Sequence, residues 1–166
     1  MHQTGVAGIH VDKNGSVYVA DQQNHRILRW DLGAYEGVVV AGKSGNAGGS
    51  VERINTPKDV YVDADLNVYV ADYPNHRIIR WAPGASEGVV VAGGNGYGSD
   101  NSKLHDPRGI YVDEENNFMY IADTRNHRIV KWEIGSSEGV TVAGGNNAGS
   151  DLNQLNHPNS VLFNNG

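Results

Sequence analysis

The chain carries one tetrapeptide three times: Asn24-His25-Arg26-Ile27, Asn75-His76-Arg77-Ile78 and Asn126-His127-Arg128-Ile129. Each copy starts 51 residues after the previous one, and a tryptophan follows each copy at the same distance. The sequence Glu-Gly-Val, which begins at positions 36, 87 and 138, keeps the same spacing. Copies in register identify a repeat protein, in which each unit packs mainly against its neighbours.

One repeat contains four short runs of residues that favour β-strands. In the second copy these runs are Asp59 to Asp63, Asn67 to Asp72, Arg77 to Trp81 and Val89 to Gly93. The links between them are short and polar, so neighbouring strands should pair antiparallel as a meander. The second and fourth runs are apolar at nearly every residue, so the sheet needs cover on both faces. Sheets stacked radially around an axis provide that cover, which predicts an all-β protein of the β-propeller class.

Composition excludes several kinds of site. The chain has no cysteine, which rules out disulfide and thiolate chemistry and leaves the cellular compartment undetermined. No apolar run reaches membrane-spanning length, so no membrane partner is expected. A formal net charge of -6 argues mildly against a polyanionic partner such as nucleic acid.

The repeated pattern resembles a known family. Asp-x-x-Asn-His-Arg-Ile after Val-Tyr-Val-Ala, with Pro-x-Gly-Ile-Tyr-Val-Asp upstream at Pro107 to Asp113, resembles the NHL repeat over about residues 5 to 164. The resemblance implies a propeller, usually with six blades. Residues 1–166 are then a single domain with blades at about 5–56, 57–106 and 107–157, and with a partial fourth-blade strand at 158–166. The first copy departs from the pattern, because Val6 stands where Pro57 and Pro107 stand in the later copies.

Three blades and one extra strand do not close a ring. Their outermost sheets would leave apolar faces in water. The sequence therefore predicts either a fragment of a longer propeller or two copies joined head to tail in a six-bladed ring. The homodimer of half-propellers is the favoured interpretation, with the surplus C-terminal strand pairing across the boundary between chains.

Residues copied into every blade are expected to be structural, because a single active site needs its residues only once. Asp72 and Arg77 should face each other across the turn between the second and third strands. Asn75 suits the turn position with positive φ, and His76 is expected to donate to neighbouring backbone. The tryptophans should pack between blades, each with a strand cation beside an aromatic ring. The full structural set is Asp21, Asn24, His25, Arg26, Trp30, Asp72, Asn75, His76, Arg77, Trp81, Asp123, Asn126, His127, Arg128 and Trp132.

Function is expected where the copies differ. One end of the blades should carry the turns between second and third strands and the long glycine-rich loops 43–56, 94–106 and 145–157. Variable loops on a rigid repeated frame are a common place for binding. The predicted anchors for a protein, peptide or glycan ligand are Arg53, Tyr73, Tyr97, His105, Arg108 and Arg125. The opposite end is acidic and reads as a solvated surface.

Two alternatives stay open beside this non-catalytic binding module. Some NHL propellers resemble peptide-amidating lyases that hold zinc with channel-facing histidines, and His10, His105 and His157 are unrepeated. No HxH or HExxH spacing supports a metal site, and blades hold His25, His76 and His127 too far apart to share one ion. Other NHL domains bind single-stranded RNA, but acidic residues interrupt the basic loop end here. The sequence thus predicts no catalytic residue, no metal and no cofactor.

Overall fold

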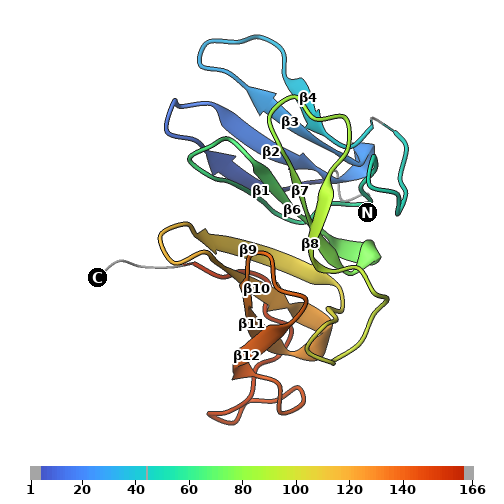
Figure 1. Ribbon diagram of the computed structural model, residues 1–166, viewed down its shortest axis with the longest axis vertical. Coiled ribbons are helices and arrows are strands. Elements are labelled where there is room, and N and C mark those ends of the chain that lie inside the picture. The colour runs from blue at the N-terminus through green and yellow to red at the C-terminus, as the bar shows by residue number, and fades with distance from the viewer. Residues whose placement is uncertain (1–4, 44, 163–166) are drawn as a thin grey trace.

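The computed structural model describes residues 5–43 and 45–162, and its strands form three four-stranded antiparallel sheets (Figure 1). The first sheet holds β1 (Val6–Val11), β2 (Val17–Asp21), β3 (Arg26–Trp30) and β4 (Val38–Ala41). The second holds β5 (Val60–Val62), β6 (Val68–Asp72), β7 (Arg77–Trp81) and β8 (Val89–Gly93). The third holds β9 (Pro107–Asp113), β10 (Phe118–Asp123), β11 (Arg128–Glu133) and β12 (Gly139–Gly144). Strand order follows chain order in each sheet, so the predicted meander is confirmed.

A single 3-10 turn joins the second and third strands of every blade. These turns are η1 (Gln22–Asn24), η2 (Tyr73–Asn75) and η3 (Thr124–Asn126). The residue with positive φ is the histidine that follows each turn, with φ of 51° at His25, 54° at His76 and 53° at His127. The expectation that Asn75 takes this position was wrong by one residue, because the 3-10 turn includes the asparagine and ends at the histidine.

The hydrophobic core lies between neighbouring blades. Ala20, Ile27 and Ile54 from the first blade pack in one buried cluster with residues of the second blade that include Ile79 and Trp81. A second cluster joins the second and third blades in the same way and includes Trp132. Both tryptophans are 1% exposed, which confirms that they pack between blades, whereas Trp30 on the first blade is only partly buried. The cation prediction holds for the third blade, where Lys131 Nζ lies 3.8 Å from the centroid of the Phe118 ring.

The innermost strands approach one another closely. Gly8 N–H of β1 donates to the Lys58 carbonyl at 3.0 Å, just before β5. A Cβ at Gly8 would lie 2.6 Å from Asp59 Cα, and one at Gly109 would lie 2.7 Å from Ser160 Cα. Positions 8, 59, 109 and 160 are equivalent in the repeat, so glycine alternates with a residue that carries a side chain.

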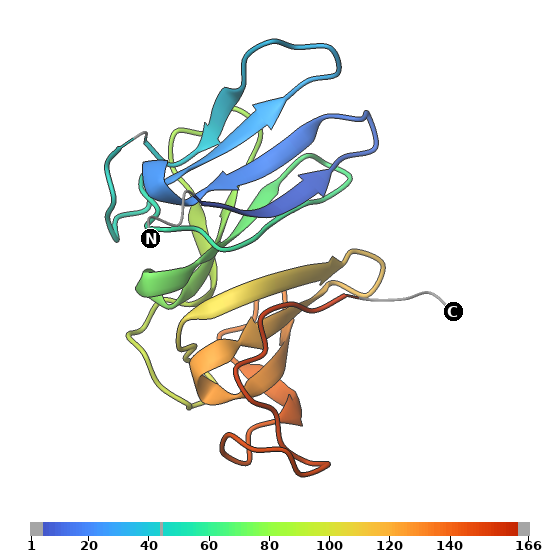
Figure 2. The same cartoon turned by 180° about the vertical axis from the view of Figure 1, so that it is seen from behind.

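The C-terminal segment runs alongside β9, as the dark red trace beside the yellow strand in Figure 2 shows. Thr124 Oγ1 donates to the Pro158 carbonyl at 2.7 Å, which fixes the start of the segment. Residues 158–162 occupy the place of a next blade's first strand, although they are not assigned as a strand, and the remainder of the predicted strand lies outside the described residues.

The outer face of the first blade is apolar and uncovered. Ile9 and Val11 are 63% and 56% exposed, whereas the equivalent residues of the second blade, Val60 and Val62, are 2% and 4% exposed beneath the first blade. The predicted open face is therefore present. None of the helices in the described part of the chain has the length and apolar character needed to cross a membrane.

Candidate functional site

The repeated polar residues hold the loops in place. Arg77 Nε donates to Asp72 Oδ2 at 2.7 Å, and both side chains are buried. Asp72 Oδ1 accepts from the Asn55 backbone N–H, and Asn75 Nδ2 donates to the Gly48 carbonyl. Burial raises the pKa of Asp72, while its hydrogen bonds and the Arg77 charge oppose that shift. These groups are satisfied within the fold, as expected for structural residues.

Each repeated histidine accepts a hydrogen bond from the loop that follows its blade. The Nδ1 atoms of His25, His76 and His127 accept from backbone N–H groups at 3.1, 3.2 and 3.2 Å. The expectation that His76 donates to backbone was wrong in direction, because its left-handed backbone turns Nδ1 toward the N–H of Asp106. Acceptance at Nδ1 places the proton of the neutral ring on Nε2.

An aromatic cluster forms at the loop end between the second and third blades. The ring centroids of Tyr97 and His105 lie 5.0 Å apart, and both lie 5.5 Å from that of His76. Arg125 Nε lies 3.3 Å from Asp106 Oδ2 beside this cluster. Three of the six predicted anchors, Tyr97, His105 and Arg125, therefore come together, and we call this set the loop-end aromatic cluster.

A second group lies nearer the axis, around a cavity of about 520 Å³. We call this cavity the axial pocket; its lining is Gly5, Val6, Ala7, Gln22, Lys58, Arg108 and Asn159. Lys58 Nζ lies 5.0 Å from the centroid of the Tyr73 ring, and Arg108 Cζ lies 5.2 Å from it. The predicted anchors Tyr73 and Arg108 are thus neighbours.

The remaining predicted anchor lies apart from both groups. The Arg53 carbonyl accepts from Arg77 Nη2 at 2.9 Å, and the Arg53 side chain lies against Gly48. Lys58, Gln22 and Asn159 also line the axial pocket, but they are not among the anchors predicted from the sequence. The sequence does relate three of the pocket residues to one another, because each follows the proline that opens a blade: Lys58, Arg108 and Asn159.

A third cavity, of about 340 Å³, lies along the inner strands. His10, Tyr61 and Tyr111 occupy equivalent positions there, and the His10 and Tyr61 ring centroids are 4.7 Å apart. Tyr61 Oη donates to Glu114 Oε1 at 3.0 Å. Burial, followed by this bond, raises the pKa of Tyr61, and burial lowers the pKa of His10 against the nearby charges of Asp12 and Glu114.

The donor set of this cavity does not fit a zinc site by itself. A catalytic zinc usually takes three protein ligands. Within residues 5–43 and 45–162, no group of three or more His, Cys, Asp or Glu side chains could hold a metal ion. The inner-strand position offers one histidine, His10, and tyrosine in the next two blades.

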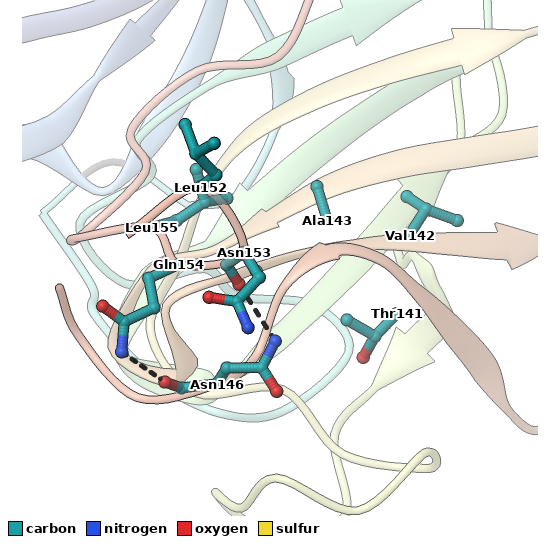
Figure 3. Close-up of a pocket in the computed structure, with 9 residues that line it drawn as sticks. Thr141, Val142, Ala143, Asn146, Leu152, Asn153, Gln154 and Leu155 are labelled. Carbon is teal, nitrogen blue, oxygen red and sulfur yellow. Dashed lines mark hydrogen bonds between the residues drawn. The ribbon is translucent and has the colours of Figure 1, made fainter. Parts of the chain in front are cut away.

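A further groove, of about 420 Å³, lies on the third blade between β12 and the loop that follows it (Figure 3). Asn146 Nδ2 donates to the Asn153 carbonyl, and Gln154 Nε2 donates to the Asn146 carbonyl, each at 2.9 Å. The groove is lined by Ala143 and Leu155, whose equivalents Ala92 and Leu104 are buried against the third blade. The groove therefore has the same lining as the surface on which the third blade packs against the second.

Three like sheets in sequence, with cores between them and loops gathered at one end, define a β-propeller array. The family model for the NHL repeat matches residues 55–81 and 104–132. The second and third repeats therefore match the NHL repeat, as the sequence resemblance implied.

Curated relatives extend beyond this chain. A probable peptidyl-alpha-hydroxyglycine alpha-amidating lyase of Caenorhabditis elegans, pgal-1, is 28% identical over 135 residues, which cover 80% of this chain and 38% of the relative. NHL repeat-containing protein 2 of Bos taurus is 34% identical over 84 residues, which cover 46% of this chain and 12% of the relative. The chain thus spans well under half the length of these relatives.

Among solved structures, a protein of unknown function from Bacteroides thetaiotaomicron VPI-5482 superposes with a TM-score of 0.73 at 20% identity. The match covers 95% of this chain and 42% of that protein. At this identity the likeness establishes the fold alone.

Proposed function

We propose that this chain is a non-catalytic binding module of an NHL propeller and that it takes its ligand at the loop end. The observation that carries the proposal is that the repeated and the unrepeated polar residues of this chain have different contacts. The repeated Asp, Asn, His and Arg side chains bind the chain's own loops, whereas the unrepeated Tyr73, Tyr97, His105 and Arg108 gather at one end. Aromatic residues and arginine are the side chains that most often anchor partners.

The way in which the loops are fixed to the blades supports the same proposal. Arg77 and Arg128 tie the loops 43–56 and 94–106 to the neighbouring blades through backbone carbonyls. Loops fixed in this way present their side chains without a large ordering cost on binding. A protein, a peptide or a glycan suits such a surface.

The test is a binding screen with matched variants. The 166-residue chain is immobilised and exposed to peptide and glycan arrays and to single-stranded RNA. Tyr97→Ala and His105→Ala should each weaken the retained ligand by about tenfold, the effect of losing one anchor worth about 1.4 kcal/mol. Tyr35→Ala is the control, because Tyr35 is fully exposed in the turn between β3 and β4. Equal retention by all variants contradicts the proposal, and retention of RNA alone favours the nucleic-acid alternative.

A lyase-like enzyme is the second candidate. It is supported by the Caenorhabditis elegans relative and by the inner-strand cavity that holds His10 and Tyr61. Because this cavity lacks three metal ligands of its own, the candidate requires further ligands from other blades. Metal analysis of the purified chain, alone and after zinc loading, tests it: stoichiometric retention of zinc that His10→Ala abolishes would favour the enzyme over the binding module.

Both the binding module and the lyase-like enzyme would need further blades to close the propeller ring. We propose that a further blade covers the groove of Figure 3 and the face of Ile9 and Val11, because the same pair of faces packs together inside the chain. That blade comes from a second copy, as in the favoured homodimer, or from further repeats of a longer chain.

A further inference from the structure

The axial pocket differs from most of the loop end in its charge balance. Three of the four other cations of that end are paired with carboxylates: Lys43 with Glu52 at 2.9 Å, Lys103 with Asp100 at 2.9 Å, and Arg125 with Asp106 at 3.3 Å. The fourth, Arg53, forms no ion pair with the residues that the structure describes. The pocket has two cations, and none of the described residues that line it carries a carboxylate.

The hydrogen-bond partners of these two cations are neutral amides. Lys58 Nζ donates to Gln22 Oε1 at 2.7 Å, and Arg108 Nη1 donates to Asn159 Oδ1 at 3.2 Å. Arg108 Nε is buried and has no hydrogen-bond partner among the residues that the structure describes. An amide accepts a hydrogen bond but supplies no countercharge, so both positive charges stay uncompensated.

The two uncompensated cations repel each other, and the pKa of Lys58 reflects this repulsion. Both cations lie beside the Tyr73 ring, within about 5 Å of its centroid. Partial burial lowers the pKa of Lys58, and the charge of Arg108 lowers it further. A bound anion would remove the repulsion, since a guanidinium and an ammonium both donate strongly to oxyanions.

We infer that the axial pocket is an oxyanion site that receives a carboxylate or phosphate group of a small ligand. The inference rests on the proposed binding function and names the ligand chemistry of one part of its surface. The cavity of about 520 Å³ is the size of a small-molecule site. Lys58 and Arg108 are the recognition residues, while Gln22 and Asn159 hold them in place.

The site is assembled from equivalent positions of successive blades. Ala7, Lys58, Arg108 and Asn159 stand at the same position of the repeat, and all four line the cavity. The repeat thus brings this position of every blade to the axis, and cations in two consecutive blades create the charge.

The experiment is a calorimetric titration of the 166-residue chain at low ionic strength. Inorganic phosphate and succinate are the two probes, which separate phosphate from carboxylate, and potassium chloride is the control for ionic strength. The expected result is saturable binding of at least one probe, weakened about tenfold or more by Lys58→Gln and by Arg108→Gln, as for the loss of one charge-assisted hydrogen bond. Lys43→Gln and Lys103→Gln remove the same charge from the same end and should leave binding unchanged.

Wild-type readouts cover the possibility that a variant fails to fold. A bound oxyanion should raise the pKa of the Lys58 ammonium, which carbon-detected NMR of the lysine side chains would measure. It should also raise the midpoint temperature of thermal unfolding. Absence of saturable binding, or equal loss in the Lys43 and Lys103 variants, overturns the inference. If neither probe binds while Tyr97→Ala still weakens a screened ligand, the oxyanion site is wrong and the binding module stands. If both results are negative, the proposed function falls as well.

Discussion

Arg77 and Asp72 form a buried strap that fastens one blade to the loop of the blade before it. The carboxylate accepts from Nε at 2.7 Å, and the terminal nitrogens donate to the carbonyls of Gly49, Ser50 and Arg53. Arg128 and Asp123 repeat the pair at 2.7 Å in the next blade. The guanidinium thus satisfies a carboxylate and three loop carbonyls at once, so the loop owes its shape to a residue of the following blade.

Replacing this arginine should destabilise the fold strongly. Arg77→Ala leaves Asp72 buried without its countercharge, and we expect a loss of about 3–5 kcal/mol in the free energy of unfolding. Arg26→Ala is the matched control, because Arg26 and Asp21 form the same pair at 2.8 Å with side chains 27% and 16% exposed. The control should lose less than half as much in urea unfolding. Equal losses would mean that the strap does not depend on burial.

The histidine after η2 should make the fold sensitive to mild acid. Burial lowers the pKa of His76 from its ordinary value of 6.5, although the Asp106 carboxylate opposes the shift. A lowered folded-state pKa means that the stability contributed by neutral His76 is present above pH 6.5 and is lost as pH falls through the folded value. His76→Asn keeps a residue that tolerates positive φ. Its free energy of unfolding should fall less than that of the wild type between pH 7.5 and 5; parallel curves would contradict the assignment.

Asp59 should have the opposite pH dependence. Its burial among the inner strands raises its pKa from 3.8 to about 6, while hydrogen bonds from the Ile110 and Val60 N–H groups oppose the shift. A raised pKa means that its stabilising contribution is complete below about pH 4 and is lost as pH rises through 6.

Asp59→Asn should therefore remove this slope from the urea unfolding profile measured between about pH 4 and 7. The variant Asp65→Asn, at an exposed turn position, should leave the pH profile of unfolding in place. A profile that Asp59→Asn does not change would show that the carboxylate is not the group that titrates.

Close contact between the inner strands predicts a steric effect at Gly8. Alanine there would bring Cβ against the Asp59 backbone, so Gly8→Ala should cost about 1–3 kcal/mol by overpacking. Gly48→Ala is the matched control, since its Cβ would meet only the flexible end of Arg53, with Cδ at 2.8 Å. Thermal unfolding of both variants distinguishes backbone contact from a general effect of replacing glycine.

The open apolar faces predict self-association of this chain. Light scattering after size exclusion should report a species larger than the monomer at micromolar concentration. Ile9→Lys should shift it toward the monomer, because the charge would have to be buried in the interface. Leu32→Lys is the control, because Leu32 is also exposed, at 86% against 63% for Ile9, but lies in the turn after β3 and not on the blade face. A clean wild-type monomer would exclude the homodimer.

The strands were predictable because the repeat supplied three readings of the same pattern. A shift of 51 residues places Ile27 on Ile78 and Trp30 on Trp81, so one copy confirms the strand limits of another. The turn geometry was less accessible. Whether the asparagine or the histidine takes positive φ depends on a 3-10 turn whose length differs by one residue from a simple hairpin.

The axial pocket could not be predicted as a unit from the sequence. Gln22 belongs to the turn η1 of the first blade, Lys58 lies just before β5, and Asn159 lies in the C-terminal segment beside β9. They converge only because each sheet is rotated about the axis relative to its neighbour. The sequence marked Tyr73 and Arg108 as different from their repeats, but no residue pattern revealed that they share a ring contact.

The alternation along the inner strands has a consequence for the size of the repeating unit. The equivalent inner-strand position alternates between a glycine and a residue with a side chain, in the order Gly8, Asp59, Gly109 and Ser160. Each glycine leaves room for the backbone of the next blade. Side chains at two neighbouring positions would collide, just as a Cβ at Gly8 would collide with Asp59. The unit that repeats along the inner strands is therefore a pair of blades, one with glycine and one with a side chain at this position.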